Sequence, residues 1–436
     1  MYHFIGIKGT GMSALAIILK QLGYSVDGSD VDKHFFTESG LIKNNIPFNS
    51  YNSKNVTADQ IIIQGASIKN DNPEVQQAKE LNLKIYFYNE MVGELTKKYK
   101  TICVAGCHGK TTTTAMLAHV LEKELGLNYL IGDGTGYANP KNAFFALESC
   151  EYQRHFLAYH PYYAIITNID LDHVDYYKDI NDVISAYESY ANNAEKLVIA
   201  YGDDPYTRTM KLRKDIIYYG LKENDDIYAK NINYTKEGIS FDVIANNEKY
   251  GHFDLPIFGT HQLLDSLAVI TIAYLEKVSS LIVNNNFQSF TGAKRRFTET
   301  IVRDSVIIDD YAHHPNEIKS TIDAIHQKYP HKNIVAIFGP HTFTRTKEFA
   351  DDYVKIFNQV DHTYILDIHP AREKQEDYPD ITSDIIINKL SNGEHINLDE
   401  YSKLLKHKGS VYAFLSPNDI SKLDQDLEGK LKNKED

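Results

Sequence analysis

The chain has 436 residues, of which 42% are hydrophobic and 24% charged, and its net charge is −13. This length exceeds what one ordinary core holds and favours about two to four domains. The negative charge argues against general nucleic-acid binding, because such a surface would repel a phosphate backbone. Cys103, Cys107 and Cys150 are too few and too irregularly spaced for a disulfide framework, which fits a reducing cytosol.

Targeting and membrane signals are not found in the sequence. The first residues lack a basic stretch followed by an apolar signal core. The chain also contains no run of about 18 apolar residues, the length a membrane span requires. We therefore expect a cytoplasmic protein without a membrane span.

Strands and helices alternate along the chain. Tyr2–Ile7 predicts a strand, and apolar residues at helical spacing from Met12 to about Leu22 predict a helix. Further strands are expected at Ser25–Asp27, Gln60–Ile63, Thr101–Ala105, Tyr163–Thr167, Leu197–Ala200, Val306–Ile308, Asn333–Phe338 and Thr363–Leu366. This alternation is typical of α/β domains with mostly parallel sheets.

Two boundaries divide this pattern into three domains. The charged segment Glu94–Tyr99 precedes a new strand and places the first boundary near residue 98. The second is expected near Gly292–Lys294, immediately before Arg295. The predicted domains are therefore 1–98, 99–293 and 294–436. The charged C-terminal residues Gly429–Asp436 are expected to form a frayed end.

The first chemical motif is a glycine turn between the first strand and the first helix. Gly9, Gly11 and Ala14 match the spacing G-x-G-x-x-A. Glycines permit the tight turn, and the N–H groups and dipole of the helix N-terminus attract a pyrophosphate. Asp30 lies about 20 residues further on, where a ribose-binding acid is expected. The motif predicts phosphate binding, but it does not distinguish NAD from a UDP-sugar.

The second motif is Gly106–Thr112, which ends like a P-loop. It has two residues between its glycines, whereas the standard motif has about four. The chemistry still applies, because backbone N–H groups can surround phosphates and Lys110 supplies a positive charge. The Thr111 hydroxyl can bind Mg²⁺. A preceding strand and a following helix make this a prediction of nucleoside triphosphate binding.

Two phosphate sites in separate domains narrow the possible functions. A nicotinamide dehydrogenase needs one dinucleotide site, and that interpretation leaves Lys110 and Thr111 unexplained. A ligase needs one site for ATP and another for its acceptor, so both motifs have a use.

Six segments appear in order along most of the chain. They are GIKGTGMSALA, GCHGKTTTT, TNIDLDH (Thr167–His173), KRRF (Lys294–Phe297), DDYAHHP (Asp309–Pro315) and PHTFTRT (Pro340–Thr346). Together they resemble the Mur ligase family of bacterial cell-wall synthesis. Within that family, the histidine pair of DDYAHHP and the PHTFTRT segment resemble those of the members that load L-alanine. The stretch Glu148–Leu157 is similar to the Gram-positive form.

The resemblance implies a three-domain α/β fold, with a Rossmann-like UDP-binding domain, a P-loop-like ATPase domain and a Rossmann-like C-terminal domain. It implies ATP and Mg²⁺ as cofactors, with Thr111, Glu148 and His173 as metal ligands. Lys110, His173, Arg296 and His313 would take part in catalysis. The implied ATP-binding residues are Gly106, Cys107, His108, Gly109, Lys110, Thr111, Thr112, Gln262, Asp265, Arg296, Asp310 and Tyr311.

The resemblance also implies the other substrates and the reaction. The carboxylate of UDP-N-acetylmuramate would attack the γ-phosphate of ATP, and the amine of L-alanine would attack the resulting acyl phosphate. Lys110 and Arg296 would stabilise charge on the transferring group. A monomer or weak homodimer is expected. The implied UDP-substrate-binding residues are Gly9, Thr10, Gly11, Met12, Ser29, Asp30, His341 and Arg345.

Several positions depart from the family pattern. Cys107 replaces a small residue, Thr342 replaces an arginine, and 415–420 replaces a glycine-rich segment. Gln262 and Asp265 stand where asparagines that face adenine are common. An ionised aspartate can accept from the adenine amine but cannot donate to a ring nitrogen, so weaker adenine selectivity is expected. A non-catalytic nucleotide-binding relative, or a ligase for another amino acid or a recycled tripeptide, stays open.

Overall fold

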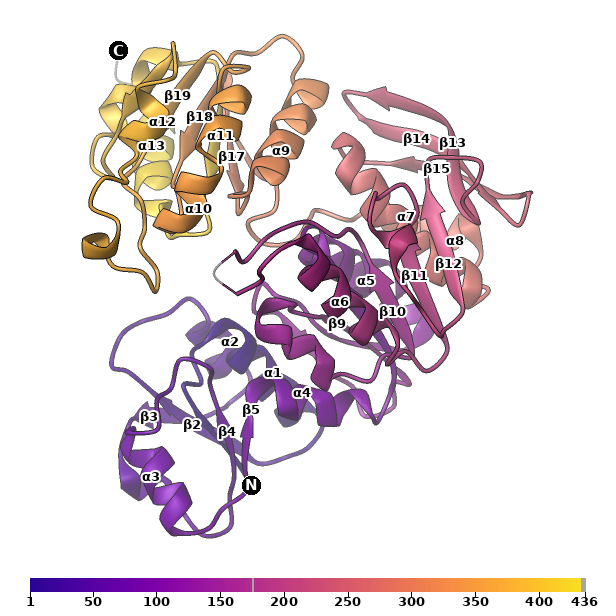
Figure 1. Ribbon diagram of the computed structural model, residues 1–436, viewed down its shortest axis with the longest axis vertical. Helices are drawn as coiled ribbons and strands as arrows, with labels where there is room; N and C mark the ends of the chain where they lie inside the picture. Colours follow the sequence, from indigo (N-terminus) through magenta and orange to yellow (C-terminus); the bar gives the residue numbers. More distant parts are fainter. Residues whose placement is uncertain (175, 433–436) are drawn as a thin grey trace. The chain divides into compact units, whose positions relative to one another are not determined.

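The computed structural model describes residues 1–174 and 176–432 (Figure 1). The chain forms two compact units. Most of the residues up to Phe290 belong to the first unit, and most of those from Thr291 belong to the second. The described residues contain three separate β-sheets, which confirms the predicted mixed α/β class.

The N-terminal sheet is parallel throughout, with strand order β3-β2-β1-β4-β5. The order is that of a doubly wound fold, in which ligands bind beyond the carboxyl ends of the strands. The predicted strand and helix at the first glycine turn are confirmed. The elements are β1 (Tyr2–Ile5), α1 (Thr10–Gln21), β2 (Val26–Asp30), α2 (Glu38–Lys43), β3 (Phe48–Ser50), β4 (Ile61–Gln64), α3 (Pro73–Glu80), β5 (Ile85–Phe87) and α4 (Tyr88–Thr96).

The second sheet has ten strands in the order β15-β14-β13-β12-β11-β10-β6-β9-β7-β8. Strand β6 pairs in parallel with both β9 and β10, so it lies in the interior of the sheet. The loop that follows its carboxyl end leads into α5. The elements are β6 (Lys100–Ala105), α5 (Lys110–Leu125), β7 (Leu127–Leu130), β8 (Gly136–Tyr137), β9 (Phe144–Glu148), β10 (Tyr163–Ile166), α6 (Ile180–Ala191), β11 (Leu197–Tyr201), β12 (Ile216–Gly220), α7 (Gly259–Leu275) and α8 (Ser280–Phe287).

Seven strands of this sheet were not predicted from the sequence. They include β7, β8, β9 and β12, and the three at one edge, β13 (Ile227–Thr235), β14 (Gly238–Ala245) and β15 (Glu248–Leu255). Asn246 and Asn247 join the last two with φ values of 49° and 64°. A two-residue turn with both φ values positive is the usual connection of a hairpin, and Asn tolerates it. The Asn-Asn pair in the sequence therefore indicates a hairpin at this position.

The C-terminal sheet has the order β16-β17-β21-β18-β19-β20, with β16 antiparallel to its neighbour and the other pairs parallel. Buried aliphatic side chains cover both of its faces. The elements are β16 (Thr298–Val302), β17 (Ser305–Asp310), α9 (Pro315–Lys328), β18 (Ile334–Phe338), α10 (Phe343–Glu348), α11 (Ala350–Phe357), β19 (His362–Ile365), α12 (Asp384–Ile387), β20 (Gly393–His395), β21 (Val411–Leu415) and α13 (Ser421–Lys432).

The predicted frayed C-terminus is wrong for Gly429 to Lys432. These residues form the last turn of α13, where Leu431 is 6% exposed. Leu423, Leu427 and Leu431 recur every four residues and pack into the core, which holds the helix in place. Residues 433–436 lie outside the described part. No helix in the described residues is long and apolar enough to cross a membrane.

Candidate functional site

The turn between β6 and α5 has the backbone shape of a phosphate-binding loop. Gly106 has φ 143°, and a Cβ there would lie 1.9 Å from Thr167 Oγ1. Gly109 has φ 82° and immediately precedes α5. The N-cap residue of that helix is Gly109, which has no side chain to cap the first N–H groups. The first turn of α5 can therefore offer its N–H groups and its positive dipole to an anion.

The segment after β10 holds this loop in shape. The Asn168 amide accepts from the backbone N–H of His108 at 2.9 Å and donates to its carbonyl at 2.9 Å. The Thr167 hydroxyl donates to the same carbonyl at 2.6 Å. Cys107 packs inward, 7% exposed, with its sulfur 3.1 Å from the backbone N and O of Asp170. The cysteine therefore leaves the outer face of the loop to backbone groups.

Lys110 lies at the centre of a buried charge cluster. Its ammonium is 2.9 Å from Glu151 Oε2 and donates to the Gly106 carbonyl at 2.5 Å. Burial opposes the charged form, but Glu151 and Glu148 raise the pKa of Lys110 above its ordinary value. Burial also opposes ionisation of Glu151, whereas Lys110 and His173 lower its pKa. The site therefore keeps a charged lysine at the helix N-terminus.

Glu151 was not among the predicted site residues. It is 2% exposed, and its Oε1 is 3.4 Å from the Nε2 of His173, a predicted metal ligand. The available signal was a second acid three positions after Glu148, in a stretch already singled out for its resemblance. The structure brings Lys110, Glu151 and His173 together from three separate segments.

Two predicted metal ligands also meet beside the loop. Thr111 Oγ1 donates to Glu148 Oε2 at 2.8 Å, and the Gly132 N–H donates to the same carboxylate oxygen at 3.0 Å. Glu148 is the last residue of β9, and Thr111 lies in the first turn of α5. A hydroxyl and a carboxylate are the hard oxygen donors that Mg²⁺ prefers.

The two predicted adenine contacts have different surroundings. Asp265 is 5% exposed and accepts from Thr113 Oγ1 at 3.0 Å, beneath the first turn of α5. The Gln262 side-chain oxygen accepts from the Phe258 N–H at 3.3 Å. An adenine contact by either residue stays a prediction.

The N-terminal glycine turn is also open for an anion. Helix α1 begins at Thr10 without a side-chain cap, Gly9 is exposed, and Met12 is buried beneath. Gly11 has no room for a side chain, because a Cβ there would lie 2.8 Å from the ring of Tyr88. The turn keeps the helix N-terminus accessible at the carboxyl end of β1.

Asp30 shapes the neighbouring loop. Its carboxylate accepts from the N–H groups of Lys8 and Val31, both at 2.7 Å. The Tyr51 hydroxyl donates to it at 3.4 Å. These bonds order the loops around the glycine turn, and contact with a ribose stays a prediction.

Ser29, predicted to contact the UDP substrate, instead faces a buried polar network. The side chain is fully buried, and its hydroxyl donates to Glu74. The His3 Nε2 lies 3.2 Å from the same carboxylate, and its Nδ1 lies 2.8 Å from Asp27 Oδ1. In this arrangement the Ser29 hydroxyl supports the sheet, and a contact with the UDP substrate stays a prediction.

The first predicted group in the C-terminal part gathers at the carboxyl end of β17. The Arg296 guanidinium lies over the Tyr311 ring, 4.9 Å from its centre. Asp310, 6% exposed, accepts from the N–H groups of Phe297 at 2.9 Å and Ala312 at 2.8 Å. Burial raises the pKa of Asp310 to about 6, and Arg296 opposes that rise.

A second group surrounds His341 in the same domain. The ring of His341 lies 6.1 Å from that of His313, and its Nδ1 is 3.3 Å from Arg345 NH1. Burial, with His313 and Arg345, lowers the pKa of His341 to about 3. A neutral His341 beside Arg345 makes this surface suitable for an anionic group.

Backbone strain and a carboxylate cap accompany this second group. Thr342 has φ 65° and ψ 143°, a region that non-glycine residues rarely occupy. Glu373 accepts from the N–H groups of Phe343 at 2.5 Å and Thr344 at 3.2 Å. The cap anchors the start of the helix that carries Arg345. Such strain is common where a side chain must be held for function.

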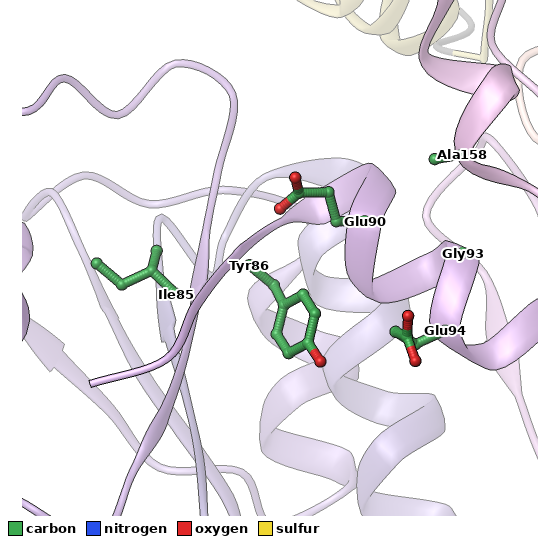
Figure 2. Close-up of a pocket in the computed structure, with 6 residues that line it drawn as sticks. All are labelled: Ile85, Tyr86, Glu90, Gly93, Glu94 and Ala158. Atoms are coloured by element: carbon green, nitrogen blue, oxygen red, sulfur yellow. The ribbon is translucent and has the colours of Figure 1, made fainter. Parts of the chain in front are cut away.

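A separate set of residues in the first unit lines a cavity of about 370 Å³ (Figure 2). Its acids already have partners, because Glu90 accepts from the Phe87 N–H at 2.8 Å and Glu94 pairs with Lys97 at 2.8 Å. None of the predicted site residues lines it. The lining residues are Ile85, Tyr86, Glu90, Gly93, Glu94 and Ala158.

The three sheets and the loop after β6 fit the class of nucleotide-dependent ligases. The match to known families agrees with this class along most of the chain. It covers the Mur ligase family catalytic domain at residues 1–100, the Mur ligase middle domain at 104–273 and the Mur ligase glutamate ligase domain at 295–408. The chain belongs to the Mur ligase family.

Individual relatives make the comparison more specific. The chain is 44% identical, over 98% of both chains, to UDP-N-acetylmuramate–L-alanine ligases of Lacticaseibacillus paracasei and Lacticaseibacillus casei. Its fold is similar to the UDP-N-acetylmuramate–alanine ligase of Thermotoga maritima, with a TM-score of 0.81 at 24% identity over 98% of both chains. A murein peptide ligase of Psychrobacter arcticus matches with a TM-score of 0.72 at 22% identity, covering 100% of this chain and 99% of that one.

Proposed function

We propose that the chain joins L-alanine to the lactyl carboxylate of UDP-N-acetylmuramate, with hydrolysis of ATP to ADP and phosphate. The identity of 44% over 98% of the chain to ligases of that name supports this function. The observation that carries the chemistry is the β6–α5 loop, where Lys110 is held charged at an uncapped helix N-terminus. Such a site suits phosphoryl transfer and serves no step of a hydride transfer.

The proposed reaction has two steps. The lactyl carboxylate attacks the γ-phosphorus of ATP, and the bond from that phosphorus to the bridging oxygen breaks. The products of this step are an acyl phosphate and ADP. The alanine amine then attacks the acyl carbon, loses a proton, and inorganic phosphate departs. Lys110 stabilises charge on the transferring phosphoryl group, and the N–H groups of α5 bind its oxygens. Glu151 pairs with both Lys110 and His173, and these contacts hold the Lys110 ammonium in position.

We propose Mg²⁺ as the metal, held by Thr111, Glu148 and His173. The oxygen donors fit, since the Thr111 hydroxyl and the Glu148 carboxylate already converge within 2.8 Å. Mg²⁺ would neutralise charge on the phosphate oxygens. The His173 ring lies beside the Glu151 carboxylate, which also pairs with Lys110.

The remaining site residues are proposed on the same basis. Gly9, Thr10, Gly11, Met12 and Asp30 would bind the UDP moiety around the N-terminus of α1. In the C-terminal domain, Arg296 would bind the γ-phosphate, with Asp310 and Tyr311 near the nucleoside. Arg345, with the neutral ring of His341 and the ring of His313 beside it, would bind the substrate carboxylates. The domain limits near residues 98 and 293, and a cytoplasmic location, belong to the same proposal.

Measuring ADP release tests the proposed function directly. The purified chain should release ADP when ATP, Mg²⁺, UDP-N-acetylmuramate and L-alanine are all present, and much more slowly without any one of them. Glycine, L-serine and the tripeptide L-Ala-γ-D-Glu-meso-diaminopimelate serve as competing acceptors. A higher kcat/KM with the tripeptide would favour the recycling ligase. No ADP release with any acceptor, from a protein that binds ATP, would favour a non-catalytic relative.

A further inference from the structure

The carboxylate of Asp265 lies directly against the phosphate-binding loop. A Cβ added to Gly109 would be 2.5 Å from Asp265 Oδ1. The same oxygen accepts a hydrogen bond from Thr113 Oγ1 at 3.0 Å. Thr113 is fully buried and Asp265 is 5% exposed, so water does not compete strongly for this bond.

This contact joins α7 to the first turn of α5. The Thr113 N–H donates to the Gly109 carbonyl at 2.9 Å, which closes the turn that contains Lys110 and Thr111. Gly109 itself has φ 82°, a conformation that its neighbours must maintain. Asp265 therefore supports the turn from below, through the side chain of Thr113 and by direct packing on Gly109.

We propose that Asp265 is a positioning residue of the phosphate loop, acting through Thr113 to place Lys110 and Thr111. This inference rests on the proposed ligase function. It differs from the expectation that Asp265 reads adenine, because Thr113 is buried inside the helix turn and has no surface for a base. A hydrogen bond to a carboxylate is stronger than one between neutral groups, which suits a support for a loop that binds charged phosphates.

The two roles predict different responses to substitution. A residue that reads adenine contributes to discrimination between bases, and its removal lowers that discrimination. A positioning residue affects every nucleotide in the same proportion, because the loop contacts only phosphates. Thr113 matters in the positioning role alone.

The test uses the full chain in the ADP-release assay, with ATP and with purine riboside 5′-triphosphate, which lacks only the exocyclic amine. Asp265→Ala and Thr113→Val should each lower kcat about 10- to 100-fold, as expected when reacting groups are misplaced by an ångström. The double variant should be no worse than Asp265→Ala alone, since Thr113→Val removes a hydrogen bond that Asp265→Ala has already removed. The ratio of kcat/KM values for the two nucleotides should stay unchanged.

Conservative variants and a matched control complete the design. Asp265→Asn and Thr113→Ser should keep near-normal kcat, because an amide oxygen still accepts and a serine hydroxyl still donates. Thr271→Val removes another fully buried threonine hydroxyl, which donates to the Leu267 carbonyl on α7 at 2.8 Å. It should lower the melting temperature without changing kcat. If Asp265→Ala does not fold, the Thr113 pair and Asp265→Asn still decide the question.

Three results would overturn the inference. They are normal kcat in folded Thr113→Val, additive losses in the double variant, or loss of the preference for ATP in Asp265→Ala. Failure of the ligase proposal itself would look different, because the unmodified chain would then release no ADP. In that case, calorimetric titration with ATP still tests the inference. Weaker ATP binding by Asp265→Ala and Thr113→Val, with normal binding by Thr113→Ser, would support it, and equal binding by all three would overturn it.

Discussion

Lys110 illustrates how a buried lysine can remain charged. Its pKa is raised by Glu151 and Glu148 against the effect of burial, so the ammonium stays protonated over the whole range of working pH. At the N-terminus of α5 its charge adds to that of the helix dipole. The positive potential of the ammonium and of the helix dipole therefore acts beside the loop, where Glu151 partly balances it.

Replacing Lys110 tests that potential. Lys110→Ala should lower kcat by at least about 100- to 1,000-fold, the scale of losing one preorganised charge at a transition state. The fold should persist, because the loop shape depends on Gly106, Gly109 and Asn168. ADP release gives the rate, and far-ultraviolet circular dichroism verifies the fold. Lys236→Ala, with a side chain that is 71% exposed, is the control. Near-normal turnover of folded Lys110→Ala would refute the proposed site.

Residues in named motifs could be predicted, whereas residues that support them could not. Lys110, Thr111 and Asn168 stand in recognisable segments, and the structure places them around one loop. Glu151 and the Asp265–Thr113 contact escaped prediction, because their roles depend on distances between segments far apart in the sequence. Ser29 illustrates the opposite problem, since its place in the sequence suited a ligand but its hydroxyl faces Glu74.

Among the elements, β1, β2 and α3 share a buried ionic network. The two ring nitrogens of His3 face two carboxylates, those of Asp27 and Glu74. Both nitrogens can donate only if the ring is doubly protonated. Burial lowers the pKa of His3, but hydrogen bonds to the two carboxylates outweigh it and raise the value to about 9. The folded domain therefore holds an imidazolium at neutral pH.

This network predicts how stability depends on pH. The pKa of His3 is raised above its ordinary value of 6.5, so its contribution is complete below about pH 6.5 and disappears as pH rises through about 9. His3→Gln should lower the free energy of unfolding at pH 6 by about 3–5 kcal/mol, the cost of breaking a buried ion pair.

Urea unfolding of both proteins between pH 6 and pH 10 gives the measurement. The difference between them should shrink as pH passes about 9. His34→Gln is the control, since the His34 side chain is 83% exposed and pairs with Glu38 at the surface. A difference that stays constant up to pH 10 would show that His3 is not an imidazolium in the folded protein.

Strand prediction worked best where the apolar runs are short and bounded by turn residues. Strands β6, β10 and β18 are nearly fully buried and fall within a residue of their predicted limits. Most residues of β13 and β15 are exposed or half-buried, and β14 alternates buried with half-buried residues, so these strands lack a continuous apolar run that would have revealed them. Helix α13 was hidden in the same way by its charged residues, although its leucines recur at helical spacing.

On the scale of the whole molecule, the three sheets provide two helix N-termini suited to phosphate. One follows β1 in the N-terminal sheet, and the other follows β6 in the second sheet. A dinucleotide enzyme has use for the first alone. A ligase has use for both, since its acceptor and ATP each carry phosphates.

The N-terminal domain should therefore bind a UDP-sugar and not a nicotinamide dinucleotide. Calorimetric titration should give saturable binding of UDP-N-acetylmuramate in the micromolar range typical of enzyme substrates, and none of NADH. Gly9→Val should weaken UDP-N-acetylmuramate binding while leaving ATP binding unchanged, because Gly9 is exposed at the helix start. Saturable NADH binding that UDP-N-acetylmuramate does not displace would favour the dehydrogenase interpretation.

The same ionic network also bears on how the N-terminal sheet selects its register. Strands β1 and β4 carry apolar residues on both faces, so a shift by one residue would cost them little hydrophobic burial. His3 and Asp27 are direct partners in the β1–β2 pairing. A one-residue slip would turn them to opposite faces and leave Glu74 buried without its cation. During folding, a misaligned β1–β2 pairing would therefore be unstable because the buried Glu74 carboxylate would lack its partner His3. Electrostatics would then determine the register of strands whose apolar residues do not determine it.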